Sequence, residues 1–228
     1  MRARNPALID FGEPDEFAES LNGFETRYRP TTSDRQFTKI DLSLPSARLV
    51  IVTRPPMLFE GSVVAEHGVV TFQLEDELQA SVNGGAANTD TIALWRKGTD
   101  YRGFQKSRLS HCSLFPNDDF SDRDWPALGG GMLQLAAGSA SLRACVREVA
   151  EVAGGALLCM SNANVRKSID CSINGCLDEA LFAAYPSQPS VAASRYLAIC
   201  RRVSEFLRES PPPSFPLVPT WRTRAVSM

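Results

Sequence analysis

The sequence predicts an α+β protein, an antiparallel β-barrel or sandwich followed by a small helical subdomain. Short runs rich in β-branched and aromatic residues follow one another from 37 to 115 at roughly ten-residue spacing. Pro, Gly and Asn separate these runs, as turn residues do. Beyond about residue 125, the apolar residues recur at three- and four-residue steps. Many short strands in succession favour a barrel or sandwich over a parallel sheet.

The expected elements begin with a short helix in "FGEPDEFAESLNGF", where Pro14 suits the first turn and Gly23 the end. The Asn83-Gly84 step predicts a tight turn, because both residues tolerate positive φ. The strands are expected at 37–44, 47–54, 57–66, 69–75, 79–83, 91–97, 100–105 and 107–115.

A helix is expected at 139–154, because apolar residues share one stripe and Gly154-Gly155 follows them. The stretch 156–177 has no regular pattern, 176–185 predicts a second short helix, and "SRYLAICRRVSEFLRES" predicts a long one. We therefore expect four parts: a β domain with a short N-terminal helix at 1–125, a helical dimerisation subdomain at 126–190, a linker helix at 191–210 and a disordered tail at 211–228.

Composition is that of a soluble globular protein, with 228 residues, 43% hydrophobic and 22% charged. The net charge of −2 gives no general electrostatic reason to bind nucleic acid or a membrane. No apolar run approaches the roughly 20 residues of a spanning helix, and the N-terminus lacks the apolar core of a signal peptide. The expected location is the cytoplasm.

The residues that carry chemistry form no recognisable catalytic or metal-binding pattern. The six cysteines are scattered without a CxxC pair, so we expect buried free thiols. His67 and His111 are the only histidines, whereas a metal-dependent β-barrel enzyme usually assembles two or three with a carboxylate. There is also no GxSxG sequence. We expect no metal, no cofactor and no enzymatic activity.

A small barrel can bind a small molecule in its mouth without any catalytic group. The candidate effector-binding residues are aromatic or cationic: Arg54, Phe72, Trp95, Tyr101 and Phe104. The alternative interpretation of each is an ordinary core or surface residue.

Spacing and residue type resemble the N-terminal domain of AraC-type transcription regulators. The resemblance rests on "FGEPDEFAESL", "FTKIDL", "VNG" and "TDTIALWRKGTDY", and "SRYLAICRRVSEFLRES" is similar to the helix that leads into the DNA-binding half of those proteins. It implies a cupin-like β-barrel that senses a small-molecule effector, with helices that form a homodimer. In the family, two helix-turn-helix motifs follow and bind successive major grooves.

The C-terminal segment departs from that family. "PPPSFPLVPTWRTRAVSM" has five prolines in eighteen residues, which excludes a helix pair. We therefore expect a regulator truncated before its DNA-binding domain. Such a chain has no DNA-binding residues of its own and would reach DNA only through the missing domain.

The stripe Leu142, Val146 and Val149 has two interpretations, because an amphipathic face shows only that something covers it. It packs either against a partner's equivalent helix or onto the chain's own barrel. Two other functions also stay open. One is a cupin-fold enzyme with a metal or a pocket carboxylate of raised pKa. The other is a truncated partner that pairs with a full-length regulator.

Overall fold

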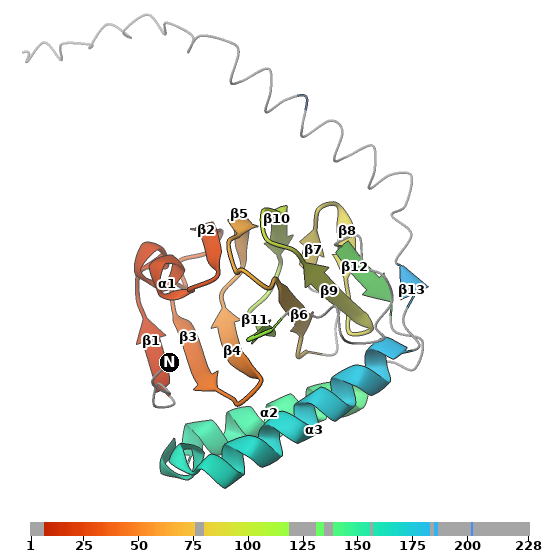
Figure 1. The fold of residues 1–228 in the computed structure, drawn as a ribbon. Helices are drawn as coiled ribbons and strands as arrows, with labels where there is room; N and C mark the ends of the chain where they lie inside the picture. Colours follow the sequence, from red (N-terminus) through yellow and green to blue (C-terminus); the bar gives the residue numbers. More distant parts are fainter. Residues whose placement is uncertain are drawn as a thin grey trace, which may run out of the picture.

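The computed structural model describes residues 7–75, 80–118, 131–134, 139–155, 157–182, 185–186 and 202. Within them, the strands form two antiparallel sheets and two long helices lie against the larger one (Figure 1). The large sheet runs in the order β1 (Ala7–Phe11), β3 (Phe37–Ser43), β4 (Ala47–Arg54), β11 (Leu109–Pro116), β6 (Val69–Gln73), β9 (Thr91–Trp95), β12 (Gly131–Gln134) and β13 (Tyr185–Pro186). The small sheet runs in the order β2 (Phe24–Pro30), β5 (Met57–Val63), β10 (Asp100–Gln105), β7 (Ala80–Val82) and β8 (Gly85–Ala87).

The predicted fold class is confirmed, in the form of a sandwich followed by helices. The described strands do not close into a barrel, because each sheet ends in edge strands, β1 and β13 in one and β2 and β8 in the other. All eight expected strands between 37 and 115 are present, within a few residues of the predicted bounds. The hairpin turn is also present: Asn83 and Gly84 have φ of 49° and 77° and join β7 to β8.

The central strands of the large sheet are buried on both faces, because helices cover one face and the small sheet covers the other. On β11, Cys112 and Leu114 belong to the cluster that contains the helices, whereas His111 and Ser113 line the space between the sheets. The same alternation divides β4, where Leu49 and Ile51 contribute to the helix-facing cluster. The large sheet therefore separates two interior layers.

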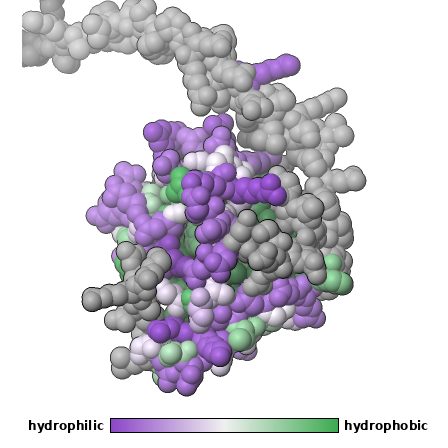
Figure 2. All heavy atoms as spheres, in the orientation of Figure 1, coloured by the Kyte–Doolittle hydropathy of each residue, from purple (hydrophilic) through white to green (hydrophobic). Residues whose placement is uncertain are grey.

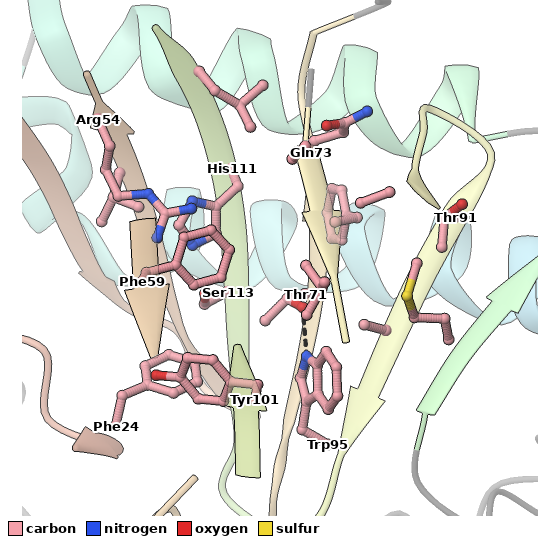
Figure 3. Close-up of a pocket in the computed structure, with 18 of the residues that line it drawn as sticks. Phe24, Arg54, Phe59, Thr71, Gln73, Thr91, Trp95, Tyr101, His111 and Ser113 are labelled. Atoms are coloured by element: carbon pink, nitrogen blue, oxygen red, sulfur yellow. Dashed lines mark hydrogen bonds between the residues drawn. The ribbon is translucent and has the colours of Figure 1, made fainter. Parts of the chain in front are cut away.

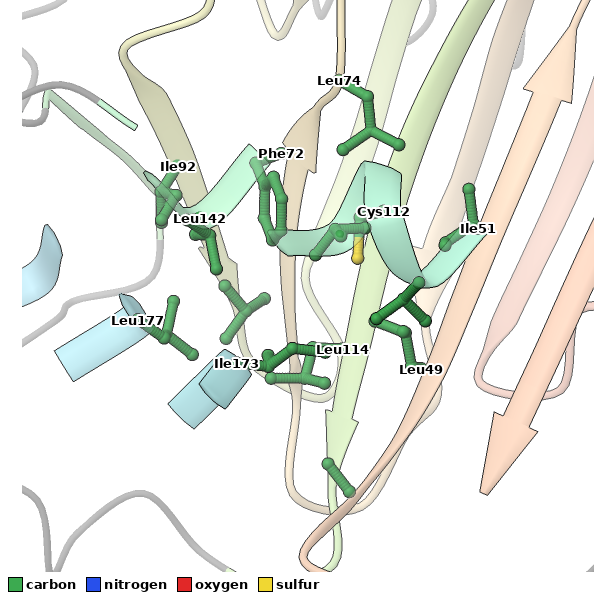
Figure 4. Packing of buried hydrophobic residues seen from close by; sticks show 14 of the residues in the cluster. Leu49, Ile51, Phe72, Leu74, Ile92, Cys112, Leu114, Leu142, Ile173 and Leu177 are labelled. Atoms are coloured by element: carbon green, nitrogen blue, oxygen red, sulfur yellow. The ribbon is translucent and has the colours of Figure 1, made fainter. Parts of the chain in front are cut away.

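The layer between the large sheet and the helices is apolar (Figure 4). It is formed with α2 (Ala140–Gly155), the short 3₁₀ helix η2 (Leu157–Ser161) and α3 (Ala163–Phe182). Leu142, Val146 and Val149 are 1%, 0% and 6% exposed within this single chain. Within this chain they pack against its own large sheet, as one of the two interpretations expects. Dimerisation through this stripe stays a prediction.

The helix α3 is much longer than expected, since 156–177 was predicted to be irregular and only 176–185 helical. Ile173 and Leu177 point into the apolar layer (Figure 4), but small and polar residues between them obscure the periodicity in the sequence. Asp170, about one turn before Ile173, is a buried polar residue with a structural role. The Asp170 carboxylate accepts a hydrogen bond from Ser46 Oγ at 2.6 Å and so ties α3 to the turn between β3 and β4.

The space between the two sheets is filled with aromatic residues at the end of the sandwich near α1 (Pro14–Ser20). Phe17 of this helix is fully buried and stacks on Phe37 with ring centroids 4.6 Å apart. Lys39 Nζ donates to the Ser20 carbonyl at 2.9 Å, which fixes the end of the helix on β3. The helix begins with Pro14, as predicted.

The described residues include only part of the four ranges into which the sequence was divided. Range 126–190 contains β12 and β13 as well as helices, and its helices share one apolar layer with the large sheet. Of the expected linker helix 191–210 only Arg202 is described, as helical, and the tail 211–228 lies outside the described residues.

Hydrophilic side chains cover most of the described surface seen in Figure 2. Among the described helices, none combines the length and apolar character needed to cross a membrane.

Candidate ligand-binding site

A cavity of about 110 Å³ lies between the two sheets, beyond the aromatic cluster. Its walls come from β4, β6, β9, β11 and β12 of the large sheet and from β2, β5, β7, β8 and β10 of the small sheet. A buried water needs roughly 10–15 Å³ of such space. The cavity therefore has room for a small molecule.

One wall of the cavity is polar, and it belongs to the inner face of the large sheet. Antiparallel pairing places His111 of β11 opposite Gln73 of β6, and Ser113 opposite Thr71 (Figure 3). Arg54, at the end of β4, pairs with Leu109, two residues from His111 on the same face. Strand register thus gathers residues from three strands.

Arg54 is the cationic group of this wall, and it is only 7% exposed. Its guanidinium carbon lies 5.0 Å from the centroid of the Phe59 ring and 5.6 Å from that of Tyr28. Its Nε atom is buried and has no hydrogen-bond partner. Among the described residues, no carboxylate forms an ion pair with it. Such a buried charge is costly unless something compensates it.

The backbone that carries Arg54 is held in place by a buried amide. Gln105 is 2% exposed, and its Nε2 donates to the carbonyls of Arg54 and Pro55 at 2.9 and 2.6 Å. The turn between β4 and β5 is therefore fixed from β10 of the small sheet. The start of the Arg54 side chain is fixed with it.

His111 lies beside Arg54 in the cavity wall (Figure 3). Burial, and then the neighbouring Arg54 charge, hold the pKa of His111 well below its ordinary value of 6.5. The imidazole is consequently neutral at physiological pH, so one ring nitrogen donates and the other accepts. Its buried Nδ1 has no hydrogen-bond partner.

The opposite part of the cavity is aromatic, and its polar atoms are already bonded. Trp95 Nε1 donates to Thr71 Oγ1 at 2.8 Å (Figure 3), and the Tyr101 hydroxyl is hydrogen-bonded to Thr26 Oγ1. Burial, with a contribution from Tyr28, raises the pKa of Tyr101, so its hydroxyl stays protonated. Phe24 meets the Tyr101 ring edge-on with centroids 5.8 Å apart. These side chains present ring surfaces to the cavity.

The structure brings four of the five predicted effector-binding residues to the cavity: Arg54, Phe72, Trp95 and Tyr101. Phe72 only borders it, because its ring packs in the helix-facing layer (Figure 4). Phe104 is not among the lining residues. It lies three residues from Tyr101 on β10 and so faces the outside, where it pairs with Leu58 and is 37% exposed.

Sequence reasoning missed the polar members of the wall. His111 was considered as a metal ligand and as a catalytic base but not as part of a binding site, and Thr71, Gln73 and Ser113 were not singled out. Their signal is polar residues two apart within apolar strands, in "VVTFQLE" and "SRLSHCSLF". Among the described residues, no group of three or more His, Cys, Asp or Glu could hold a metal ion.

Comparisons with known proteins support the fold alone. No protein-family model matches the sequence. No curated protein matches it either. The structure is similar to the crystal structure of the AraC-like transcriptional activator CuxR, with a TM-score of 0.54 and 13% sequence identity. The match covers 88% of this chain and 79% of that one. The chain thus shares its fold with that structure.

Proposed function

We propose that this chain is the effector-sensing module of an AraC-like transcription regulator, and that the cavity between its sheets is the effector site. The likeness to an AraC-like activator supports the regulator part of the proposal. The cavity supports the sensing part, because it combines apolar walls with a few convergent polar groups, as small-molecule sites do.

The observation that carries the proposal is the pair Arg54 and His111. Both have a buried nitrogen without a hydrogen-bond partner, and both line the same cavity. Buried polar groups are nearly always hydrogen-bonded, and an uncompensated buried charge is expensive. A ligand that forms hydrogen bonds with these groups would compensate the cost of burying them between the sheets.

We propose binding without turnover. The described residues that line the cavity include no Asp, Glu or Cys. The neutral His111 has no carboxylate to orient it there, as a general base usually needs. A site of this composition can hold and orient a molecule, and the fold can respond to its presence.

The test is a thermal-shift screen of sugars, amines, carboxylates and neutral aromatic compounds. Ala93 lines the cavity opposite Thr71, so the variant Ala93→Leu fills space there. Phe104→Leu on the outer face is the matched control. We expect a compound that stabilises the wild type and the control saturably, and Ala93→Leu much less. A screen without such a compound, or equal binding by Ala93→Leu, would refute the proposal.

A further inference from the structure

We propose that the effector is a small organic monoanion. Its single acidic group, a carboxylate or an acid of similar geometry, pairs with Arg54, and its apolar, flat body lies against Trp95 and Tyr101. The proposal rests on the proposed function, because it assigns a ligand chemistry to the same cavity.

The first step is the uncompensated charge. Arg54 is nearly buried, and the ion pairs formed by the described residues join other groups. The guanidinium keeps its charge at physiological pH. An anion that enters this cavity meets a cation that is 7% exposed, so their attraction is much less screened than at the surface. Charge complementarity therefore favours an acid over a neutral molecule.

The second step is the geometry of Arg54. The rings of Phe59 and Tyr28 contact the guanidinium carbon, which leaves the N–H groups in the plane of the guanidinium for another partner. The Nε–H is among them and has no acceptor. A carboxylate accepts two parallel hydrogen bonds from this fork. The site thus has the donor arrangement that planar acids fit.

The third step limits the ligand to one charge. Arg54 is the one Lys or Arg among the described residues that line the cavity. The neighbouring His111 is neutral, because its pKa is far below 6.5. It can donate or accept a hydrogen bond to the acid, but it adds no positive charge. A second acidic group would be buried without a counter-charge.

The fourth step concerns the body of the ligand. The indole N–H of Trp95 and the hydroxyl of Tyr101 are bonded to Thr71 and Thr26. Their rings, with that of Phe24, leave flat apolar surfaces for a ligand. Stacked and edge-on ring contacts favour an aromatic or otherwise flat body there. A sugar would leave most of its hydroxyl groups without partners against these rings.

The test compares acids with their matched amides, which differ little in shape. The probes are 3-phenylpropanoate and 3-phenylpropanamide, indole-3-acetate and indole-3-acetamide, and cyclohexanecarboxylate and its amide. Phenylsuccinate serves as a dianion. Binding is measured by calorimetry on the wild type, on Arg54→Gln and on the control Arg102→Gln, whose side chain is half exposed outside the cavity.

We expect at least one acid to bind the wild type and Arg102→Gln at least tenfold more tightly than its amide. We expect Arg54→Gln to lose that preference and phenylsuccinate to bind more weakly than 3-phenylpropanoate. Equal binding of acid and amide by the wild type would overturn the inference even if Arg54→Gln fails to fold. If Ala93→Leu then prevents binding of the amide, the cavity is still the binding site and the proposed function is retained. If no probe binds, the inference is refuted, and the thermal-shift screen decides the proposed function separately.

Discussion

Arg54 of the large sheet and Phe59 of the small sheet meet across the cavity, with the guanidinium carbon 5.0 Å from the ring centroid. This contact joins the two sheets of the sandwich beside the proposed ligand site. An anion bound to Arg54 would change the charge that the ring contacts. Ligand binding would therefore alter a contact that joins the two sheets.

The first prediction is that Arg54→Met stabilises the ligand-free protein. The variant removes a buried charge that costs several kcal/mol, and it loses ring contacts worth about 0.5–2 kcal/mol. We expect Tm to rise by about 2–4 °C, which corresponds to roughly 1 kcal/mol in a chain of this size. The measurement is thermal unfolding by circular dichroism.

The control for this prediction is Arg102→Met, which removes an arginine ion-paired to Glu60 with its side chain 51% exposed. Its Tm should change little, because exposed ion pairs contribute little stability. If Arg54→Met instead lowers Tm by several degrees, Arg54 is a structural residue. The argument for a ligand would then lose its main support.

The second prediction concerns pH. The pKa of His111 is lower in the folded protein than its ordinary value of 6.5, so the unfolded chain binds the proton more tightly. The contribution of the neutral His111 to the unfolding free energy is fully present above about pH 6.5. It is lost as the pH decreases below that value, by at most about 1.4 kcal/mol per pH unit. The groups that face His111 are Arg54 on β4 and the neutral Gln73 on β6.

This dependence is measured by denaturant unfolding between about pH 5 and 7.5. Burial alone would raise the pKa of Asp41, but Arg48 and Lys39 lower it below 3.8, so this group titrates outside that range. The variant His111→Gln should flatten the pH dependence. The exposed His67→Gln should keep the wild-type slope. A wild-type slope in His111→Gln would show that His111 takes up its proton equally in the folded and the unfolded chain, which would contradict its lowered pKa.

The third prediction separates core packing from dimerisation. Leu142 of α2 is 1% exposed, so Leu142→Ala should cost about 2–5 kcal/mol of unfolding free energy. Val152 on the same helix is 44% exposed, and Val152→Ala should cost little. Whether the chain forms the expected homodimer is measured by sedimentation. Loss of a dimer in Leu142→Ala without loss of stability would contradict the packing described here.

The fourth prediction concerns the thiols. Cys171 is exposed on α3, whereas Cys112 is fully buried on β11. Burial, and then the nearby Cys145, raise the pKa of the Cys112 thiol. Iodoacetamide should therefore modify Cys171 rapidly in the native protein, and Cys112 only after unfolding, because the thiolate reacts. Peptide mass spectrometry resolves the two sites, and early labelling of Cys112 would contradict the fold.

Much of the β-sandwich could be predicted from the sequence, because turn residues mark the ends of its strands. Asn83-Gly84 is the clearest case. The strands β1 and β2 were missed because "ALIDF" precedes a helix directly and "FETRYRP" alternates charged residues with few apolar ones. The greater part of α3, before Cys176, was missed because polar residues such as Asp170 contribute to its buried side through hydrogen bonds, which hydrophobic periodicity does not detect.

The candidate site could be predicted only in part. Arg54, Trp95 and Tyr101 were found from residue type alone, and Phe104 was misplaced because strand alternation was not applied to it. The proximity of Arg54 and His111 depends on the pairing of β4 with β11, which are far apart in the sequence. A local sequence pattern does not reveal the pairing register of two strands that are far apart in the chain. The polar wall therefore appears only in the folded chain.

The most direct test of the central claim is a crystal structure of the protein with the tightest-binding acid from the matched pairs. The account predicts the ligand between the two sheets, with its acidic oxygens about 2.7–2.9 Å from the guanidinium nitrogens of Arg54. Its body should lie against Trp95 and Tyr101. An acid bound elsewhere above an empty cavity, or bound with its acidic group turned away from Arg54, would contradict the account.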